Sequence, residues 1–361
     1  SPFEKEEGGD DPNSFLQGDM HIYLTRFVRE SEYYYRKLLE FEPRFMSEYG
    51  FSSLPSEDTY RRFNYFEKEL DFARNPWLGE LPWLKELAEK GNMQDTIYMT
   101  QFTHAQALKY WIEYLRSCKW ICGGSLYWKF NDPIAPNREE NMLFPTLMSV
   151  IDFARNPKLA YYYAKRAYED VILAFREKTG GLAVYGCNET ENAYKGVLTI
   201  RLMDFDGRIF YEKKKKTCIQ ADCSEELFML EEELLKSADP ESSYVYAAFE
   251  PDERADWIFR LENRFMLLEI GEWNRVKLPE ASLSVDMEKI DGKNYEVKIS
   301  AGKYAQDVML TVQDTDAFYS DNGFCMDAGN VKNVHIRFAK ETGCGKRLLI
   351  RTANAEDQVI L

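Results

Sequence analysis

The chain has 361 residues, 45% of them hydrophobic, so it is long enough to form two or three globular domains. Its formal net charge of -15 repels phosphate backbones and anionic lipid headgroups, which argues against nucleic acid and membrane surfaces as partners. No apolar run reaches the roughly 18 residues that a membrane span needs, and the polar N-terminus is unlike a signal peptide, so we expect a cytoplasmic protein.

The cysteines are spread along the chain and follow no known pattern. There are seven of them, an odd number, with no Cys-x-x-Cys pair and no histidine at ligand spacing. This distribution predicts neither a disulfide framework nor a zinc site, and we expect no metal or organic cofactor. The seven positions are Cys118, Cys122, Cys187, Cys218, Cys223, Cys325 and Cys344.

Residues 1 to about 30 read as a long loop, and from there to about residue 175 helical and strand signals alternate. Ser31–Phe41 has a helical pattern, and Arg44–Ser47 reads as a short strand that stops at a carboxylate. Apolar residues recur at intervals of three and four over Thr96–Leu115, which predicts a helix. The apolar run Trp120–Trp128 follows with little alternation and predicts a buried strand. Strand, helix and strand in this order are typical of the βαβ unit of a parallel sheet.

After about residue 178 the hydrophobic period changes from near four to two. Asp206-Gly207 and Asp291-Gly292 supply hairpin turn signals between the alternating segments. We therefore predict two immunoglobulin-like β-sandwich domains, over residues 178–273 and 274–361. The alternating segments are Gly196–Leu202, Ser243–Phe249, Tyr295–Ile299, Val308–Val312 and Val334–Phe338.

One carboxylate stands at the end of a predicted strand. Glu48 follows the strand Arg44–Ser47 and is itself followed by Tyr49-Gly50. In a (β/α)8 barrel the carboxyl ends of the strands form the active face, so an acid in this position points into the site. Taken alone, a glutamate at a strand end is most often a solvated surface acid. Glu48 therefore needs support from other segments.

Four segments, in matching order along the chain, resemble the β-mannosidases of glycoside hydrolase family 2. Arg44–Ser56 is similar to the family's seventh barrel strand, whose glutamate is the nucleophile, and Gly123–Asp132 is similar to its eighth strand. Gly18-Asp19-Met20-His21 resembles a Gly-Asp-x-His segment before the nucleophile strand. Phe318–Phe324 is similar to a turn in the last sandwich domain.

The resemblance implies a multidomain protein of α/β and all-β parts. Residues 1–177 would be the C-terminal portion of a (β/α)8 TIM barrel, followed by the two sandwiches. The implied activity is that of a retaining exo-glycosidase that hydrolyses terminal β-D-mannosides by double displacement, with a carbohydrate substrate and no cofactor. Glu48 would be the nucleophile and Trp128 a platform under the sugar. The other residues expected to bind substrate or orient the site are His21, Asp19, Tyr23 and Asp132.

Two departures from the family pattern matter. Ile22-Tyr23 stand where the family usually has an aromatic residue, often tryptophan, which leaves the preferred sugar open. No Asn-Glu pair precedes Glu48, although a retaining glycosidase needs a second carboxyl group as its acid/base. A whole barrel takes about 250 residues. We therefore expect this chain to act only together with N-terminal domains of the same protein, and to be inactive alone.

Two alternatives remain open at this point. The chain could be a non-catalytic module for carbohydrate binding or assembly, in which the sandwiches do the work. It could also come from an enzyme of the same family for another β-glycoside, such as a glucosaminide, glucuronide or galactoside.

Overall fold

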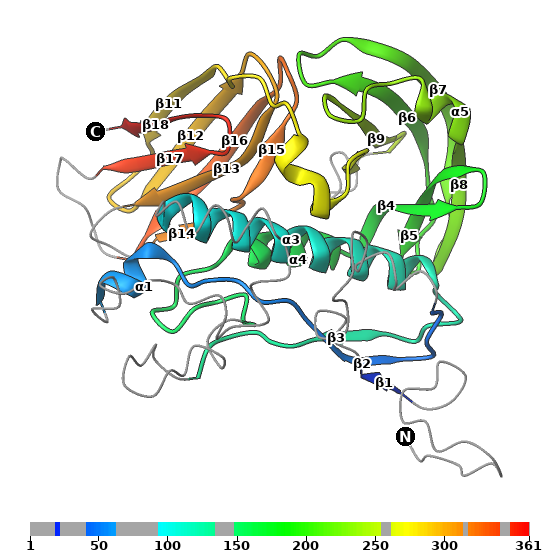
Figure 1. Ribbon diagram of the computed structural model, residues 1–361, viewed down its shortest axis with the longest axis horizontal. Coiled ribbons are helices and arrows are strands. Elements are labelled where there is room, and N and C mark those ends of the chain that lie inside the picture. The colour runs from blue at the N-terminus through cyan, green and yellow to red at the C-terminus, as the bar shows by residue number, and fades with distance from the viewer. Residues whose placement is uncertain are drawn as a thin grey trace.

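A computed structural model describes residues 19–21, 41–62, 93–133, 148–253, 261–312, 317–339 and 347–360. Two β-sandwiches stand side by side, and two helices run along their base (Figure 1). A small sheet lies on the far side of these helices. The chain is mostly β, as the alternating patterns predicted.

The small sheet is parallel and carries the predicted βαβ unit. Its order is β1-β2-β3, with β1 (Met20–His21), β2 (Met46–Tyr49) and β3 (Ser125–Tyr127). The predicted helix between the last two strands is confirmed as α3 (Met93–Ser117). The predicted helix at Ser31–Phe41 lies outside the described residues but for Phe41. The predicted C-terminal portion of a (β/α)8 barrel is not seen as a barrel within the described ranges, where these three parallel strands form an open sheet.

The prediction of a buried strand over Trp120–Trp128 was wrong in extent and in burial. The strand spans only Ser125–Tyr127, and exposed fractions reach 75% for Trp120, 58% for Leu126 and 47% for Trp128. Helix α3 covers one face of the sheet, so the residues that point the other way have no cover among the described residues. The predicted stop before Glu48 was also wrong, because β2 continues through Glu48 and Tyr49.

Helix α3 joins the parallel sheet to the rest of the molecule. The Trp111 ring lies 5.5 Å from the Tyr49 ring and 4.9 Å from the Phe51 ring, both at the end of β2. On another side of the helix, Phe102 packs at 4.3 Å against Trp273 of the short helix η5 (Ile270–Arg275). The helix is buried around much of its circumference, as expected of a helix that packs between layers.

The first sandwich consists of the sheets β4-β5-β8 and β10-β9-β6-β7. Its strand β4 begins at Val171, before the predicted domain boundary of 178, because the chain enters the sheet directly after helix α4 (Leu159–Ala167). The predicted turn at Asp206-Gly207 joins β6 to β7, with Gly207 at φ 93°. The bounds are β4 (Val171–Lys178), β5 (Gly181–Asn188), β6 (Tyr194–Asp204), β7 (Ile209–Ile219), β8 (Cys223–Glu231), α5 (Glu232–Lys236), β9 (Ser243–Pro251) and β10 (Leu261–Met266).

The second sandwich consists of the sheets β11-β12-β16-β14 and β15-β13-β17-β18. Its neighbouring strands pair antiparallel, and the described residues after Pro279 form no helix. Aliphatic side chains of both sheets form one core. The bounds are β11 (Leu283–Lys289), β12 (Asn294–Ala301), β13 (Ala305–Val312), β14 (Ala317–Tyr319), β15 (Phe324–Met326), β16 (Val331–Phe338), β17 (Leu348–Thr352) and β18 (Ala355–Ile360).

The Phe318–Phe324 turn holds the second sandwich against α4. The Arg166 guanidinium donates to the Asp321 carboxylate at 2.7 Å and to the carbonyls of Asn322 and Gly323. Gly323 has φ 56°, and a Cβ there would lie 2.5 Å from Leu159 Cδ1. Both the backbone conformation and the close approach to α4 therefore require glycine.

A buried ion pair joins the two sandwiches. Arg264 of β10 donates two hydrogen bonds, at 2.7 and 2.6 Å, to the Asp327 carboxylate of the second sandwich. Tyr244 of β9 adds a third at 2.8 Å. The side chains of Arg264 and Asp327 are only 12% and 7% exposed, so water solvates neither charged group well.

Arg264→Ala is expected to lower the free energy of unfolding by about 3–5 kcal/mol, because it leaves the Asp327 carboxylate buried without its cation. Urea unfolding followed by tryptophan fluorescence measures this change. The matched control is Arg275→Ala, which removes an exposed guanidinium paired with Glu241 and should leave the midpoint unchanged. Equal effects of the two substitutions would contradict the assignment of Arg264 as a junction residue.

Candidate functional site

Between paired positions, strand β2 has one residue more than β1 on one side and one residue more than β3 on the other. Opposite β1, Met46 and Glu48 pair with the consecutive residues Met20 and His21. Opposite β3, Met46 pairs with Ser125 and Tyr49 pairs with Tyr127, so two residues of β2 lie opposite a single residue of β3. A bulge therefore lies between Met46 and Tyr49, in the segment that holds Glu48. Bulges beside functional sites change the direction in which a side chain points.

Glu48 makes a direct contact with His21. The His21 Nε2 atom lies 3.0 Å from Glu48 Oε1, and their side chains are 51% and 28% exposed. The contact follows from the pairing of β1 with β2, which places these two residues opposite each other. At this distance the imidazole N–H donates to the carboxylate and fixes the direction of one oxygen.

Ser47 holds the bulge on the β1 side. Its Oγ atom lies 3.1 Å from the Met20 carbonyl oxygen, and it also hydrogen-bonds the Asp19 carboxylate. That hydrogen bond from Ser47 is the main cause of the lowered pKa of Asp19. Asp19 therefore stays ionised beside His21.

Trp128 and Glu48 point to the same face of the sheet. Tyr49 and Tyr127 pair across β2 and β3, and their rings pack against Trp111 and Tyr168 on the helical side. Tyr49 is fully buried on that side, whereas the side chains of Glu48 and Trp128 are 28% and 47% exposed, so these two turn away from the helices. The Trp128 N–H donates to the Tyr49 carbonyl at 2.7 Å, which ties the end of β3 to that of β2.

Gly50 is required where the chain leaves β2. A Cβ at this position would lie 2.1 Å from the Trp128 carbonyl oxygen. The following loop is held against α3 by buried hydrogen bonds, including Ser53 Oγ to His104 Nδ1 at 2.8 Å and Lys158 Nζ to the Ser53 carbonyl at 2.9 Å. The segments after Glu48 and Trp128 are therefore closely packed and held in place.

Asp132 lies in the interior behind the site. It is 4% exposed, and neither carboxylate oxygen has a hydrogen-bond partner that meets normal geometry among the described residues. Burial raises its pKa to about 6, and the nearby charge of Lys158 opposes that shift. The pKa of the buried Lys158 is lowered to about 8, mainly by burial.

The structure brings some of the predicted site residues together and separates others. Asp19, directly before β1, lies beside His21 of β1 and Glu48 of β2, and Trp128 follows the adjacent strand on the same face. Asp132 is in the interior, and Tyr23 lies outside the described residues. Within the described ranges no group of three or more histidine, cysteine or acidic residues could hold a metal ion.

A groove of about 740 Å³ lies elsewhere, where α3, α4 and the two sandwiches meet. Several of its charged side chains are paired, as Lys109 is with Glu113 within the groove and Arg166 is with Asp321 outside it. Neither Glu48 nor Trp128 lines it. We place the candidate site at the end of the parallel sheet, because that is where a carboxylate, an imidazole and an exposed indole come together.

The sequence missed two features of this site. The bulge at Ser47 leaves no mark in the hydrophobic pattern, because only the partner strands show that a residue is extra. Tyr168 also gave no signal, although its hydroxyl reaches Ser125 and Tyr49. The place of His104 within the pattern of α3 indicates a structural role, and its buried contact with Ser53 agrees with that interpretation.

Comparisons with known proteins agree with the resemblance seen in the motifs. A family model described as a mannosidase Ig/CBM-like domain matches residues 180–257, and one described as an Ig-fold domain matches residues 278–353. The β-mannosidase of Mus musculus is 25% identical over 346 residues, covering 88% of this chain and 37% of the mouse protein. That of Rattus norvegicus is 29% identical over 216 residues, covering 53% of this chain and 23% of the rat protein.

Solved structures show the same fold. The β-D-mannosidase of Dictyoglomus thermophilum aligns with a TM-score of 0.78 and 22% identity, covering 97% of this chain and 42% of that one. The exo-chitosanase of Amycolatopsis orientalis aligns with a TM-score of 0.61 and 17% identity, covering 88% and 42%. The chain therefore resembles the C-terminal part of a β-mannosidase-like enzyme, and it spans less than half the length of these relatives.

The free energy of unfolding of Asp132→Asn should rise relative to that of the wild type as the pH increases. Because the folded-state pKa of Asp132 is raised, the protonated acid contributes stability below about pH 4 that is lost as the pH rises through about 6. Asparagine, which stays neutral, avoids this loss. The variant should gain on the wild type by about 3 kcal/mol between pH 4 and 7, a value that follows from the raised pKa, which already includes the attraction to Lys158. Urea unfolding at several pH values measures the difference, and a constant difference would contradict the burial of this carboxylate.

Proposed function

From this similarity, we propose that the chain contributes the nucleophile of a retaining exo-glycosidase that hydrolyses terminal β-D-mannosides. The observation that supports this best is the position of Glu48 in the bulge of a parallel strand, at its carboxyl end, with His21 holding its carboxylate. Acids at the carboxyl ends of barrel strands form the active face of (β/α)8 enzymes. The motif order and the β-mannosidase relatives support the choice of a glycosidase.

The reaction requires two displacements at one carbon. A Glu48 oxygen attacks the anomeric carbon, the bond to the leaving oxygen breaks, and a second carboxylic acid gives its proton to that oxygen. Water then attacks the same carbon, the second group takes its proton, and Glu48 leaves as a carboxylate. Each step inverts the centre, so the product keeps the β configuration. His21 holds the attacking oxygen in one direction, and Asp19 keeps a negative charge beside the imidazole.

Trp128 suits the role of platform under the sugar. Its indole is 47% exposed on the face to which Glu48 points, so it is open to a ligand. A flat aromatic face packs against the apolar C–H groups of a pyranose ring and excludes water there. Asp132, which is buried, would support the end of this strand from behind and would not touch the sugar itself.

The remaining barrel strands and the acid/base are proposed to come from N-terminal domains of the same protein. Parallel sheets are almost always covered on both faces. Here the helices cover one face, while Leu126, Trp128 and Phe130 are each about half exposed. The strands of a (β/α)8 barrel would bury part of these side chains and leave the pocket above Glu48.

A carbohydrate-binding or assembly module without catalysis is the second candidate, since one matching family is described as Ig/CBM-like. Flat sugar-binding faces use exposed aromatic side chains. Of the large aromatic side chains in the described part of residues 178–273, Phe210 is exposed, and the Arg208 guanidinium lies over its ring at 5.2 Å. The enzyme proposal is favoured, because the exposed indole and the carboxylate lie together on the parallel sheet.

In the full-length protein, Glu48→Gln should abolish hydrolysis of an aryl β-mannoside, because an activated leaving group tolerates loss of the acid but not of the nucleophile. Azide should restore turnover in Glu48→Ala and yield the α-mannosyl azide, since the small anion fills the vacated space. The control is Glu288→Gln, at an exposed position of strand β11, which should keep full activity. A β-configured azide product, or normal turnover by Glu48→Gln, would rule out Glu48 as nucleophile.

The 361-residue chain by itself should not hydrolyse aryl β-mannosides at a measurable rate. General acid catalysis alone is worth about 10²- to 10⁴-fold, and most of the pocket wall would also be missing. The assay compares equal concentrations of the chain and the full-length protein. Activity of the chain comparable to that of the full-length protein would show that the acid/base lies within these 361 residues.

A further inference from the structure

Three hydroxyl groups hold the bulge of β2 on the β3 side. The Ser125 Oγ atom lies 3.2 Å from Tyr49 Oη and 2.9 Å from Tyr168 Oη, and Tyr168 Oη lies 3.1 Å from the Ser125 carbonyl oxygen. One consistent arrangement has Tyr49 donating to Ser125 Oγ, Ser125 Oγ to Tyr168, and Tyr168 to the carbonyl. Burial holds the pKa of Tyr49 well above its usual range, so that its hydroxyl stays protonated. We call Tyr49, Ser125 and Tyr168 the hydroxyl triad.

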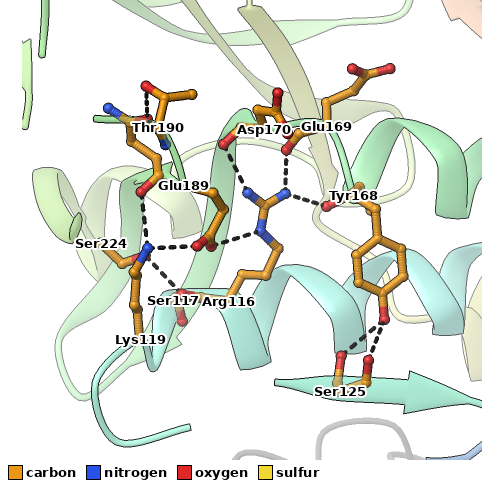
Figure 2. A network of polar contacts seen from close by, with 12 residues as sticks. Arg116, Ser117, Lys119, Ser125, Tyr168, Glu169, Asp170, Glu189, Thr190 and Ser224 are labelled. Atoms are coloured by element: carbon orange, nitrogen blue, oxygen red, sulfur yellow. Dashed lines mark hydrogen bonds and ion pairs between the residues drawn. The ribbon is translucent and has the colours of Figure 1, made fainter. Parts of the chain in front are cut away.

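The third member of the triad comes from outside the parallel sheet. Tyr168 lies between α4 and β4, the strand with which the first sandwich begins. The Arg116 guanidinium at the end of α3 donates to the carbonyls of Ala167, Glu169 and Asp170, on both sides of Tyr168 (Figure 2). The backbone that carries Tyr168 is therefore fixed by three charge-assisted hydrogen bonds.

Arg116 also contacts the first sandwich. Arg116 Nε lies 3.6 Å from the Glu189 carboxylate, directly after β5, and Lys119 Nζ lies 2.5 Å from it (Figure 2). The Ser224 hydroxyl of β8 donates to the Arg116 carbonyl at 2.8 Å. A continuous set of contacts thus runs from the first sandwich through Arg116 and Tyr168 to Ser125 and Tyr49.

We propose that Tyr168 is a positioning residue for Glu48, through which the first sandwich sets the register of β2 on β3. The inference rests on the proposed function of Glu48 as nucleophile. Tyr49 is the next residue after Glu48. Between the paired positions Met46 and Tyr49 the bulge interrupts the pairing of β2 with β3, which resumes where the Trp128 N–H donates to the Tyr49 carbonyl. The triad adds a side-chain constraint on the β3 side, next to the interrupted pairing, as Ser47 does on the β1 side.

The physical consequence is a precise carboxylate position. Removing the Tyr168 hydroxyl leaves Ser125 and Tyr49 bonded only to each other within the triad, and Ser47 and Glu48, which lie between the positions paired with β3, can shift. A displacement of about 1 Å at a reacting group can cost about 100-fold in rate. Loss of positioning lowers the rate of attack on the anomeric carbon, whereas binding of the sugar depends on other contacts.

The test compares Tyr168→Phe with wild type in the full-length protein. Phenylalanine keeps the ring beside Tyr127, whose centroid lies 6.2 Å away, and removes only the hydroxyl. We expect kcat per active site to fall at least tenfold while KM changes less than threefold. Active sites are counted from the pre-steady-state burst of aryl alcohol, so that partial unfolding does not count as a lower rate. The control is Tyr161→Phe on the neighbouring helix α4, which should keep kcat and KM.

Ser125→Ala provides a second route to the same result, since it removes the central hydroxyl of the triad from the β3 side. Combined with Tyr168→Phe, it should add less than its separate effect, because both break one network. A fall in kcat of less than tenfold in Tyr168→Phe would overturn the proposal, whatever the effect of Ser125→Ala. Should Tyr168→Phe fail to fold, Ser125→Ala alone decides. Turnover by Glu48→Gln would instead refute the proposed function itself, so the two failures can be told apart.

Discussion

The burial of helix α3 is the interaction on which the other parts of the molecule depend. Trp111, which is fully buried, packs on the end of β2, while Phe102 packs on Trp273 below the sandwiches. Truncating a buried tryptophan or phenylalanine typically costs about 3–5 kcal/mol, so these contacts are large on the scale of domain stability. The Arg116 side chain at the end of the same helix then holds the entry to the first sandwich. One helix therefore fixes the sheet and the sandwich at the same time.

Buried polar groups determine how the two helices and the two sandwiches join. Arg264 meets Asp327 between the sandwiches, and the buried Asp307 carboxylate accepts hydrogen bonds from Tyr98 of α3 and Tyr163 of α4. The cost of removing such charges from water offsets much of their attraction, so their net contribution to stability is small. A shifted arrangement would leave each charge buried without its partner. We infer that these groups select one relative arrangement of the parts, while the apolar contacts supply the stability.

The candidate site combines rigidity with an open face. The loop after Glu48 is held from behind by His104, Lys158 and Asp152, all of them buried. On the other side, Glu48, His21 and Trp128 are partly exposed. This arrangement suits a nucleophile, because the attacking oxygen needs a fixed direction and the sugar needs access. It also agrees with the proposal that this chain carries one catalytic carboxylate and that other domains of the protein carry the second.

Local patterns in the sequence determine much of the architecture. The three-and-four spacing of α3 and the alternation in the sandwich strands each report which side of one element meets a core, so they can be read from neighbours in sequence. The motifs around Glu48 and Trp128 likewise placed the two residues on adjacent strands. The tertiary structure alone decided the bulge in β2, the exposure of Leu126 and the pairing of Arg264 with Asp327. A bulge exists only relative to partner strands, exposure depends on what covers a face, and an ion pair joins residues distant in sequence. Tyr168 reaches Ser125 for the same reason, because packing between separate segments decides which hydroxyl groups meet.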